Sequence, residues 1–177
     1  MNGKNITLIS FGYFDEDFIK EVAGAVGTEF RCLVNIKEGY IDLNEFYDPL
    51  RRQYNGTRLL NEVENTYSSD GFKTMGLFSI DLYIPILTYI FGQAYLNGRS
   101  GIASCHRLSN ERYGIAAEGK LLIERFAKEV IHELGHTFGL IHCHSITCVM
   151  RSGTYVEDID QKSANFCPEC CSILNSI

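Results

Sequence analysis

The 177-residue chain lacks several features that mark common classes of protein. No apolar run reaches the roughly 18 residues that a membrane-spanning helix requires. The longest mostly apolar stretch, 82–91, is short and is interrupted by Pro85. Basic clusters are scarce, because Arg51-Arg52 is the only adjacent basic pair and the net charge is −6. These absences argue against a membrane-spanning protein and against nucleic acid as the main partner.

The N-terminal residues also lack a secretory pattern, since their apolar run is brief and is followed by acidic residues. We therefore expect a cytoplasmic protein, and we expect it to be a monomer. In that compartment the seven cysteines are expected to stay out of disulfides, and metal binding is the favoured use for most of them. The length is most simply that of one domain, with or without a small cap.

The spacing of apolar residues predicts a mixed α/β chain. Strands are predicted at 5–14, 30–36, 73–84, 88–96 and 102–108, and helices at 16–26, 58–67 and 118–140. Asp15 and Thr57 are expected to cap the first two helices, and Gly27 to end the first. Asn97-Gly98 predicts the turn of a hairpin. The strand, helix, strand order at the start predicts a parallel pair of strands.

The longest predicted helix carries the most informative motif of the chain, His132-Glu133-x-x-His136. A spacing of four residues places both imidazoles on one helical face, where they can bind one Zn²⁺ ion. Glu133 then lies beside the metal, which is the position of a general base for a zinc-bound water. Gly139 can end the helix and reverse the chain, so that His142 becomes the third ligand.

The short motif alone is weak support, because residue usage gives it by chance in roughly one of a few hundred chains this long. The added glycine and third histidine lower that chance by about another thousandfold. An exposed helix with two histidines of no function is therefore a poor alternative.

A second group of metal-binding residues follows directly. Cys143, Cys148, Cys167 and Cys170 form two short-spaced pairs separated by a loop, which indicates a closed tetrahedral zinc site. Such a structural zinc contributes on the order of 10–16 kcal/mol and can order a polar segment with little core of its own. Cys171 is the alternative to Cys170, although the x-x spacing favours Cys170. Four reduced, buried cysteines without metal are the other alternative.

The remaining cysteines and histidines are expected to be structural. Cys32 and Cys105 fall in predicted strands and are interpreted as core residues. His106 is expected to be a strand side chain that could also line a cleft, and His144 is expected to be exposed.

Taken together, these residues resemble the archaemetzincin family of metzincin-type zinc metallopeptidases. The family pattern is HExxHxxGxxHC, four residues, C-x-M and a downstream CxxC. The chain carries it as His132 to Cys143, Cys148-Val149-Met150 and Cys167-Pro168-Glu169-Cys170. The stretches 47–54, 81–85 and 91–93 are also similar to that family. No ligand position departs from the pattern.

The resemblance implies a metzincin-like α/β (α+β) fold, with a twisted mixed sheet of about five strands, backing helices and a long active-site helix. Residues 1–142 would form the sheet-and-helix part, and residues 143–177 a small subdomain with the structural zinc. Met150 would form an apolar floor beneath the catalytic metal, and an antiparallel edge strand within 88–96 would pair with extended substrate. Some metzincins carry a tyrosine two residues after that methionine; this chain has Ser152 there, with Tyr155 nearby.

The expected activity is hydrolysis of peptide bonds by a zinc-activated water, with Glu133 as the general base. The expected cofactors are two Zn²⁺ ions per chain, one catalytic and one structural, and the expected partner is a peptide or protein substrate. One alternative is a zinc-containing peptide-binding or scaffold protein with little hydrolysis, against which the retained Glu133 argues. Another is a purely structural zinc module, for which only the four cysteines argue.

Overall fold

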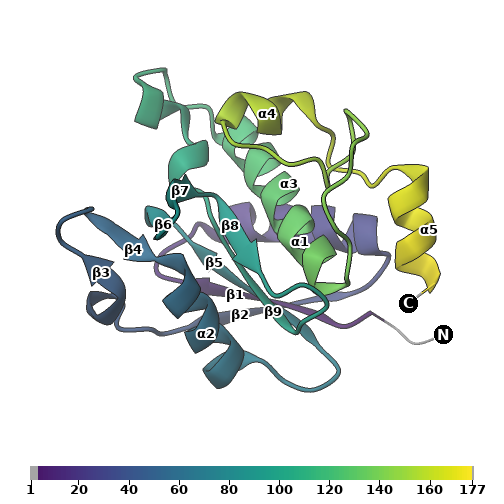
Figure 1. The fold of residues 1–177 in the computed structure, drawn as a ribbon, viewed down its shortest axis with the longest axis horizontal. Helices are drawn as coiled ribbons and strands as arrows, with labels where there is room; N and C mark the ends of the chain where they lie inside the picture. Colours follow the sequence, from purple (N-terminus) through teal and green to yellow (C-terminus); the bar gives the residue numbers. More distant parts are fainter. Residues whose placement is uncertain (1–3, 177) are drawn as a thin grey trace.

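The computed structural model describes residues 4–176 and has a five-stranded sheet at its centre (Figure 1). The strand order is β2-β1-β5-β9-β8. These strands are β1 (Ile6–Phe11), β2 (Val34–Gly39), β5 (Lys73–Phe78), β8 (Gly92–Ala94) and β9 (Ser100–Ser104). Neighbouring strands are parallel except for β8, which runs antiparallel to β9 at one edge. The predicted mixed sheet of about five strands and the parallel pair at its start are therefore confirmed.

Helices cover both faces of this sheet (Figure 1). Helices α1 (Glu16–Phe30) and α3 (Gly119–Thr137) pack on one face, and α2 (Gly56–Tyr67) packs on the other. The pleat of β1 explains the division, because Leu8 belongs to the core on the α1 and α3 face while Ile9 belongs to the core beneath α2. No helix within residues 4–176 is both long enough and apolar enough to cross a membrane.

The C-terminal part contains two short helices, α4 (Val156–Gln161) and α5 (Pro168–Ser176), where the sequence predicted only polar turns and a cysteine-rich segment. Its side chains Met150 and Ile159 join the same core as Leu8 and α3. The division of the chain after residue 142 stays a prediction, since the two parts share this core.

A smaller sheet, absent from the sequence-based prediction, has the strand order β3-β4-β6-β7. Its strands are β3 (Tyr47–Asp48), β4 (Gln53–Asn55), β6 (Leu82–Ile84) and β7 (Leu87–Ile90). The single strand predicted at 73–84 is therefore wrong, because β5 ends at Phe78 and β6 joins the other sheet. The side chains of Arg51 and Gln53 donate hydrogen bonds to the carbonyls of Leu87 and Thr88 at 2.8 and 2.9 Å. These bonds fix the segment that continues into edge strand β8.

Helix α1 does not end at Gly27, as the sequence predicted. It continues to Phe30 and ends at Arg31, which adopts a left-handed conformation with φ of 54°. Phe30 packs against the rings of Phe138 and Phe166 at 5.2 and 5.4 Å, so burial of an aromatic side chain extends the helix past the glycine. Residues 30–33 consequently precede β2 rather than begin it.

Two other element boundaries differ from those predicted. The N-cap of α2 is Asn55, whose side chain accepts the backbone N–H of Arg58, and not Thr57. Strand β9 ends at Ser104, and the residues predicted to extend it form a 3₁₀ turn (His106–Leu108). Cys105 is buried as expected but lies outside a strand. The hairpin predicted at Asn97-Gly98 joins β8 and β9.

Candidate active site

Helix α3 presents His132 and His136 on one face, as their spacing predicts. Nδ1 of His132 lies 2.8 Å from the carbonyl oxygen of Val149, and Nδ1 of His136 lies 2.7 Å from that of Leu140. A carbonyl only accepts, so each Nδ1 carries a hydrogen and each Nε2 keeps a free lone pair. The two Nε2 atoms are 3.1 Å apart, close to the roughly 3.3 Å spanned by two imidazole ligands of a tetrahedral zinc.

The end of α3 turns the chain so that His142 faces these two histidines. Gly139 has φ of 90°, and the N–H groups of Gly139 and Leu140 donate to His136 and Gly135 at 2.9 and 3.0 Å. This pattern is a Schellman motif, for which glycine is the preferred residue because it has no Cβ. One ring nitrogen of each of the three histidines lies within 4.8 Å of the others. The structure thus brings together the three predicted ligands, and an all-imidazole set of this kind suits Zn²⁺.

The β8–β9 hairpin holds the end of α3 in place. The backbone N–H of Asn97 donates to the carbonyl of His136 at 2.9 Å. The ammonium of Lys73, on β5, donates to the carbonyls of Gly98 and Thr137 at 2.7 and 2.8 Å. These bonds satisfy carbonyls that a helix end leaves unpaired, and a cation there is favoured by the helix dipole. The edge strand and helix α3 are therefore held at a fixed spacing.

Met150 is fully buried and packs against Gly135, in the turn of α3 between the two helical histidines. A Cβ on Gly135 would overlap Sδ of Met150. We predict that Gly135→Ala lowers the free energy of unfolding by about 1–3 kcal/mol, because the overlap outweighs the better helix propensity of alanine. Thermal unfolding followed by circular dichroism measures the change.

The control for this prediction is Gly24→Ala in α1, an exposed position where a Cβ meets nothing within 4 Å. Alanine there is expected to raise the free energy of unfolding by about 0.5–1 kcal/mol, as in any exposed helix. If Gly135→Ala raised the free energy of unfolding as Gly24→Ala does, the close packing of Met150 on α3 would be contradicted.

Three buried charged side chains surround the first histidine. Glu133 and Glu129 are each 5% exposed, and each carboxyl group influences the pKa of the other. Lys162 is 2% exposed; its Nζ lies 3.1 Å from the carbonyl oxygen of Arg151 and 3.4 Å from Nδ1 of His132. Burial, followed by the charge of Glu129, raises the pKa of Glu133 well above its usual value, while Lys162 opposes that shift. Glu133 is therefore a stronger base than an exposed carboxylate.

The sequence analysis missed Glu129 and Lys162. Glu129 lies one helical turn before Glu133, so its four-residue spacing was a usable signal. Lys162 is 30 residues from His132 and lies in a segment without a recognisable pattern, so no local signal marks it.

These side chains line a cleft of about 380 Å³. Its lining includes two chain segments, residues 87–92 and residues 152–155. Strand β8 begins in it at Gly92, where a Cβ would lie 2.6 Å from Cγ of Glu133. The missing side chain therefore lets the backbone of the edge strand approach the carboxylate closely. β8 lies within the range 88–96 in which the cleft strand was predicted, and Ser152 and Tyr155 both line the cleft.

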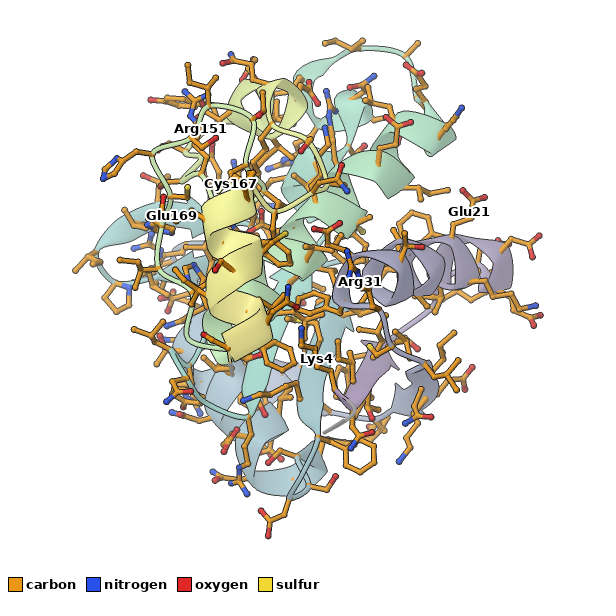
Figure 2. The ribbon with its side chains drawn as sticks, turned by 90° about the vertical axis from the view of Figure 1, so that its right-hand side faces the viewer. Lys4, Glu21, Arg31, Arg151, Cys167 and Glu169 are labelled. Atoms are coloured by element: carbon orange, nitrogen blue, oxygen red, sulfur yellow. The ribbon has the colours of Figure 1, made fainter. Side chains whose placement is uncertain are left out.

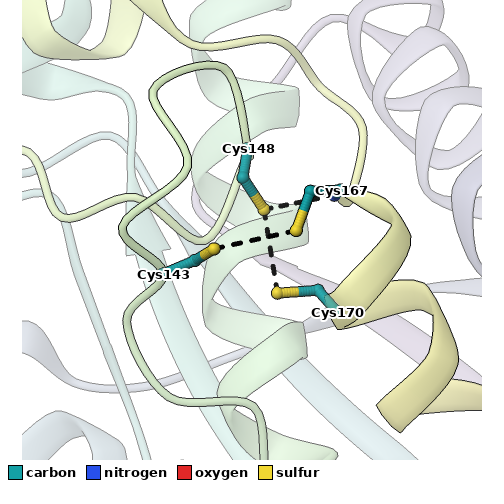
Figure 3. Close-up of side chains that lie close together, drawn as sticks. All are labelled: Cys143, Cys148, Cys167 and Cys170. Atoms are coloured by element: carbon teal, nitrogen blue, oxygen red, sulfur yellow. Dashed lines mark hydrogen bonds between the residues drawn. The ribbon is translucent and has the colours of Figure 1, made fainter.

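The four predicted cysteine ligands converge beside the histidine site (Figure 3). The Sγ atoms of Cys143 and Cys167 are 3.7 Å apart, and those of Cys148 and Cys170 are 3.8 Å apart. Four sulfurs bound tetrahedrally to zinc at about 2.3 Å would be roughly 3.8 Å apart. The sulfur of Cys171 lies outside this group, 3.7 Å from the carbonyl oxygen of Phe166. The geometry therefore favours Cys170 over Cys171.

The thiols of the sulfur cluster differ in pKa, because burial raises the pKa of Cys148 and Cys170 while that of Cys167 is lowered. The backbone N–H of Cys170, with smaller contributions from the neighbouring thiols, lowers the pKa of Cys167 to about 7. The thiolate is the form that binds metal. Figure 2 shows Cys167 at the beginning of α5. On the same helix, Cys171 and Asn175 line a separate pocket together with Lys4 and Arg31.

The cysteine cluster and the histidine site share backbone contacts. The N–H of Cys143 donates to the carbonyl of Met150 at 3.0 Å. Val149, whose carbonyl fixes the ring of His132, follows Cys148 directly. The remaining two histidines belong to neither ligand group. His144 is exposed, and His106 lies in the 3₁₀ turn.

Comparison with known proteins gives a consistent result over nearly the whole chain. Residues 20–176 match the model of peptidase family M54. The archaemetzincin of Thermococcus kodakarensis is 40% identical over 172 residues, which cover 93% of this chain and 92% of that protein. The crystal structure of the Methanopyrus kandleri archaemetzincin superposes with a TM-score of 0.85 at 31% identity, covering 99% of this chain and 95% of that one. A zinc-dependent peptidase from Methanocorpusculum labreanum gives a TM-score of 0.87 at 29% identity, covering 96% and 100%.

The fold, the three convergent histidines and these relatives define a zinc metallopeptidase of the metzincin type. A peptidase acts on peptides or proteins, as expected. The chain belongs to peptidase family M54, the archaemetzincins.

Proposed function

We propose that the protein hydrolyses peptide bonds with one zinc held by His132, His136 and His142 and with Glu133 as the general base. The observation that carries the proposal is the pair of free Nε2 lone pairs, 3.1 Å apart, beside a buried carboxylate at the start of the cleft strand. When bound, zinc supplies a Lewis acid that polarises the scissile carbonyl and lowers the pKa of a water molecule.

The protein side chains supply the remaining steps. Val149 and Leu140 hold His132 and His136 in the tautomer that leaves Nε2 free. Glu133 accepts a proton from the attacking water at its carboxylate and passes it to the leaving amine. The unpaired edge of β8 offers backbone groups that bind the substrate as an added strand.

We further propose that Cys143, Cys148, Cys167 and Cys170 hold a second, structural zinc, so that each chain contains two. The tetrahedral sulfur spacing supports this proposal. We also propose that the protein is a cytoplasmic monomer. All seven cysteines lie within the described residues, and none of them is in a disulfide there.

The test combines metal analysis with a peptide digest. Purified protein is expected to contain two zinc ions, one removed readily by a chelator and one resistant. With both ions present it is expected to cleave members of a peptide library, as detected by mass spectrometry. Two zinc ions and peptide binding without cleavage would instead favour a zinc-containing peptide-binding or scaffold protein.

Zinc affinity at the histidine site is expected to change little between pH 7.5 and 6.5. Burial, with additional repulsion from Lys162, lowers the pKa of all three histidines below 6.5. Protons therefore begin to compete with zinc only below pH 6.5, as the pH falls through these lowered values. Competition with a chromophoric chelator is expected to show less than about a threefold loss, whereas three unshifted histidines would give roughly a sixfold loss over the same interval. A sixfold loss would contradict the prediction.

A further inference from the structure

A hydrogen bond joins two segments that line the cleft. The phenolic hydroxyl of Tyr89 donates to the backbone carbonyl of Thr154 at 2.9 Å. Tyr89 belongs to the lining segment 87–92, and Thr154 belongs to the lining segment 152–155. An extended chain that runs between these two segments must pass the bridge.

The ring of Tyr89 is held from several directions. The guanidinium of Arg107 lies 4.4 Å from the ring centre, and the ring of Phe91 packs edge-to-face at 5.5 Å. Arg107 is itself bound to Asp81 by two hydrogen bonds of 2.7 and 2.6 Å, and Asp81 is buried. A cation on the ring face and a bidentate ion pair behind it both oppose rotation of the ring. Tyr89 is therefore a fixed wall of the cleft.

The direction of a bound peptide follows from edge strand β8, on the assumption of the proposed function. Antiparallel pairing is the more stable arrangement for a peptide added to a sheet edge. A peptide antiparallel to β8 places the residues that follow the cleaved bond beside those that precede Gly92. Gly92 lies against Glu133, so the cleaved bond lies near Gly92. Tyr89 is three residues further back, before the bend at Phe91 that separates β7 from β8, so it lies at most roughly 10 Å from Gly92.

We propose that Tyr89 determines substrate length by closing the cleft to peptides with more than about three residues after the cleaved bond. The enzyme would then release short segments from the carboxyl ends of peptides. This inference rests on the proposed function, because it takes Glu133 and the histidine-bound zinc as the point of cleavage.

The test measures binding and does not depend on turnover. The probes are hydroxamates, which anchor on zinc, each followed by one to six alanine residues that extend toward Tyr89. For the zinc-loaded protein, affinity is expected to fall about tenfold or more once the chain exceeds three residues, because the bridge then clashes with it. Tyr89→Ala is expected to bind all lengths with similar affinity. Tyr89→Phe keeps the ring packing if the alanine variant is unstable, and is expected to reduce the length dependence by about threefold or more.

The matched control is Tyr13→Ala, because Tyr13 is 87% exposed and does not line the cleft. It is expected to keep the length dependence of the unmodified protein. Affinity independent of length, or a length dependence that both Tyr89 variants retain, would overturn the inference and leave the zinc centre intact. Length-dependent binding without any peptide hydrolysis would support the inference and contradict the proposed hydrolytic function. Failure to bind any hydroxamate would contradict both.

Discussion

Replacing Glu133 by glutamine is expected to remove peptide hydrolysis while both zinc sites stay filled. Glutamine has nearly the same shape, so it can occupy the buried position beside Gly92 and donate a hydrogen bond to Glu129. It cannot accept the proton of the attacking water. General-base catalysis contributes about 10²–10⁴-fold, so we expect kcat/KM to fall by at least that range. Initial rates on a library peptide that the unmodified protein cleaves, together with zinc content, measure the effect.

The control is Glu124→Gln on the same helix, where the side chain is exposed. This variant makes the same change of charge without altering the cleft, so its rate is expected to equal that of the unmodified protein. Full activity in Glu133→Gln would remove Glu133 from the mechanism. Loss of zinc in Glu133→Gln would instead indicate a structural role for the carboxylate.

The candidate metal ligands could be predicted because tetrahedral coordination imposes its geometry on sequence spacing. His132 and His136 must be four residues apart to share a helical face, and Gly139 must permit the reversal that brings His142 back. The structure shows each of these features, including the positive φ at Gly139. The choice between the adjacent residues Cys170 and Cys171 could be made only from the structure, because only the direction of the side chain distinguishes them.

Features that depend on contacts between distant segments could not be predicted. The second sheet pairs β4 with β6, and its members are too short to stand out from the loops around them. The bond from Tyr89 to Thr154 spans 65 residues. The end of α1 was mispredicted for a related reason, since the burial of Phe30 against Phe138 outweighed the local preference of Gly27. If Tyr89 determines substrate length as proposed, substrate selection depends on residues that no local sequence pattern marks.

Replacing Cys148 by serine is expected to release the structural zinc and to disorder the C-terminal part of the chain. A serine hydroxyl is a poor zinc ligand, and the binding free energy lost, about 10–16 kcal/mol for a structural zinc, is comparable to the whole stability of a domain. Activity is expected to fall as well, because Val149, the next residue, supplies the carbonyl that fixes His132. Metal analysis should show at most one zinc per chain, and thermal unfolding should show a large drop in Tm.

Cys171→Ser provides the matched control for this prediction, because Cys171 lies in the same helix as Cys170 but points away from the other sulfurs. Its zinc content is expected to stay at two, and its Tm to change by only about 2 °C, as for a conservative substitution at the edge of the core. Cys170→Ser is expected to behave as Cys148→Ser does. Loss of zinc from Cys171→Ser together with retention in Cys170→Ser would reverse the choice of the fourth ligand. Retention of two zinc ions in Cys148→Ser would show that Cys148 is not a ligand of the second zinc and would contradict the four-cysteine site.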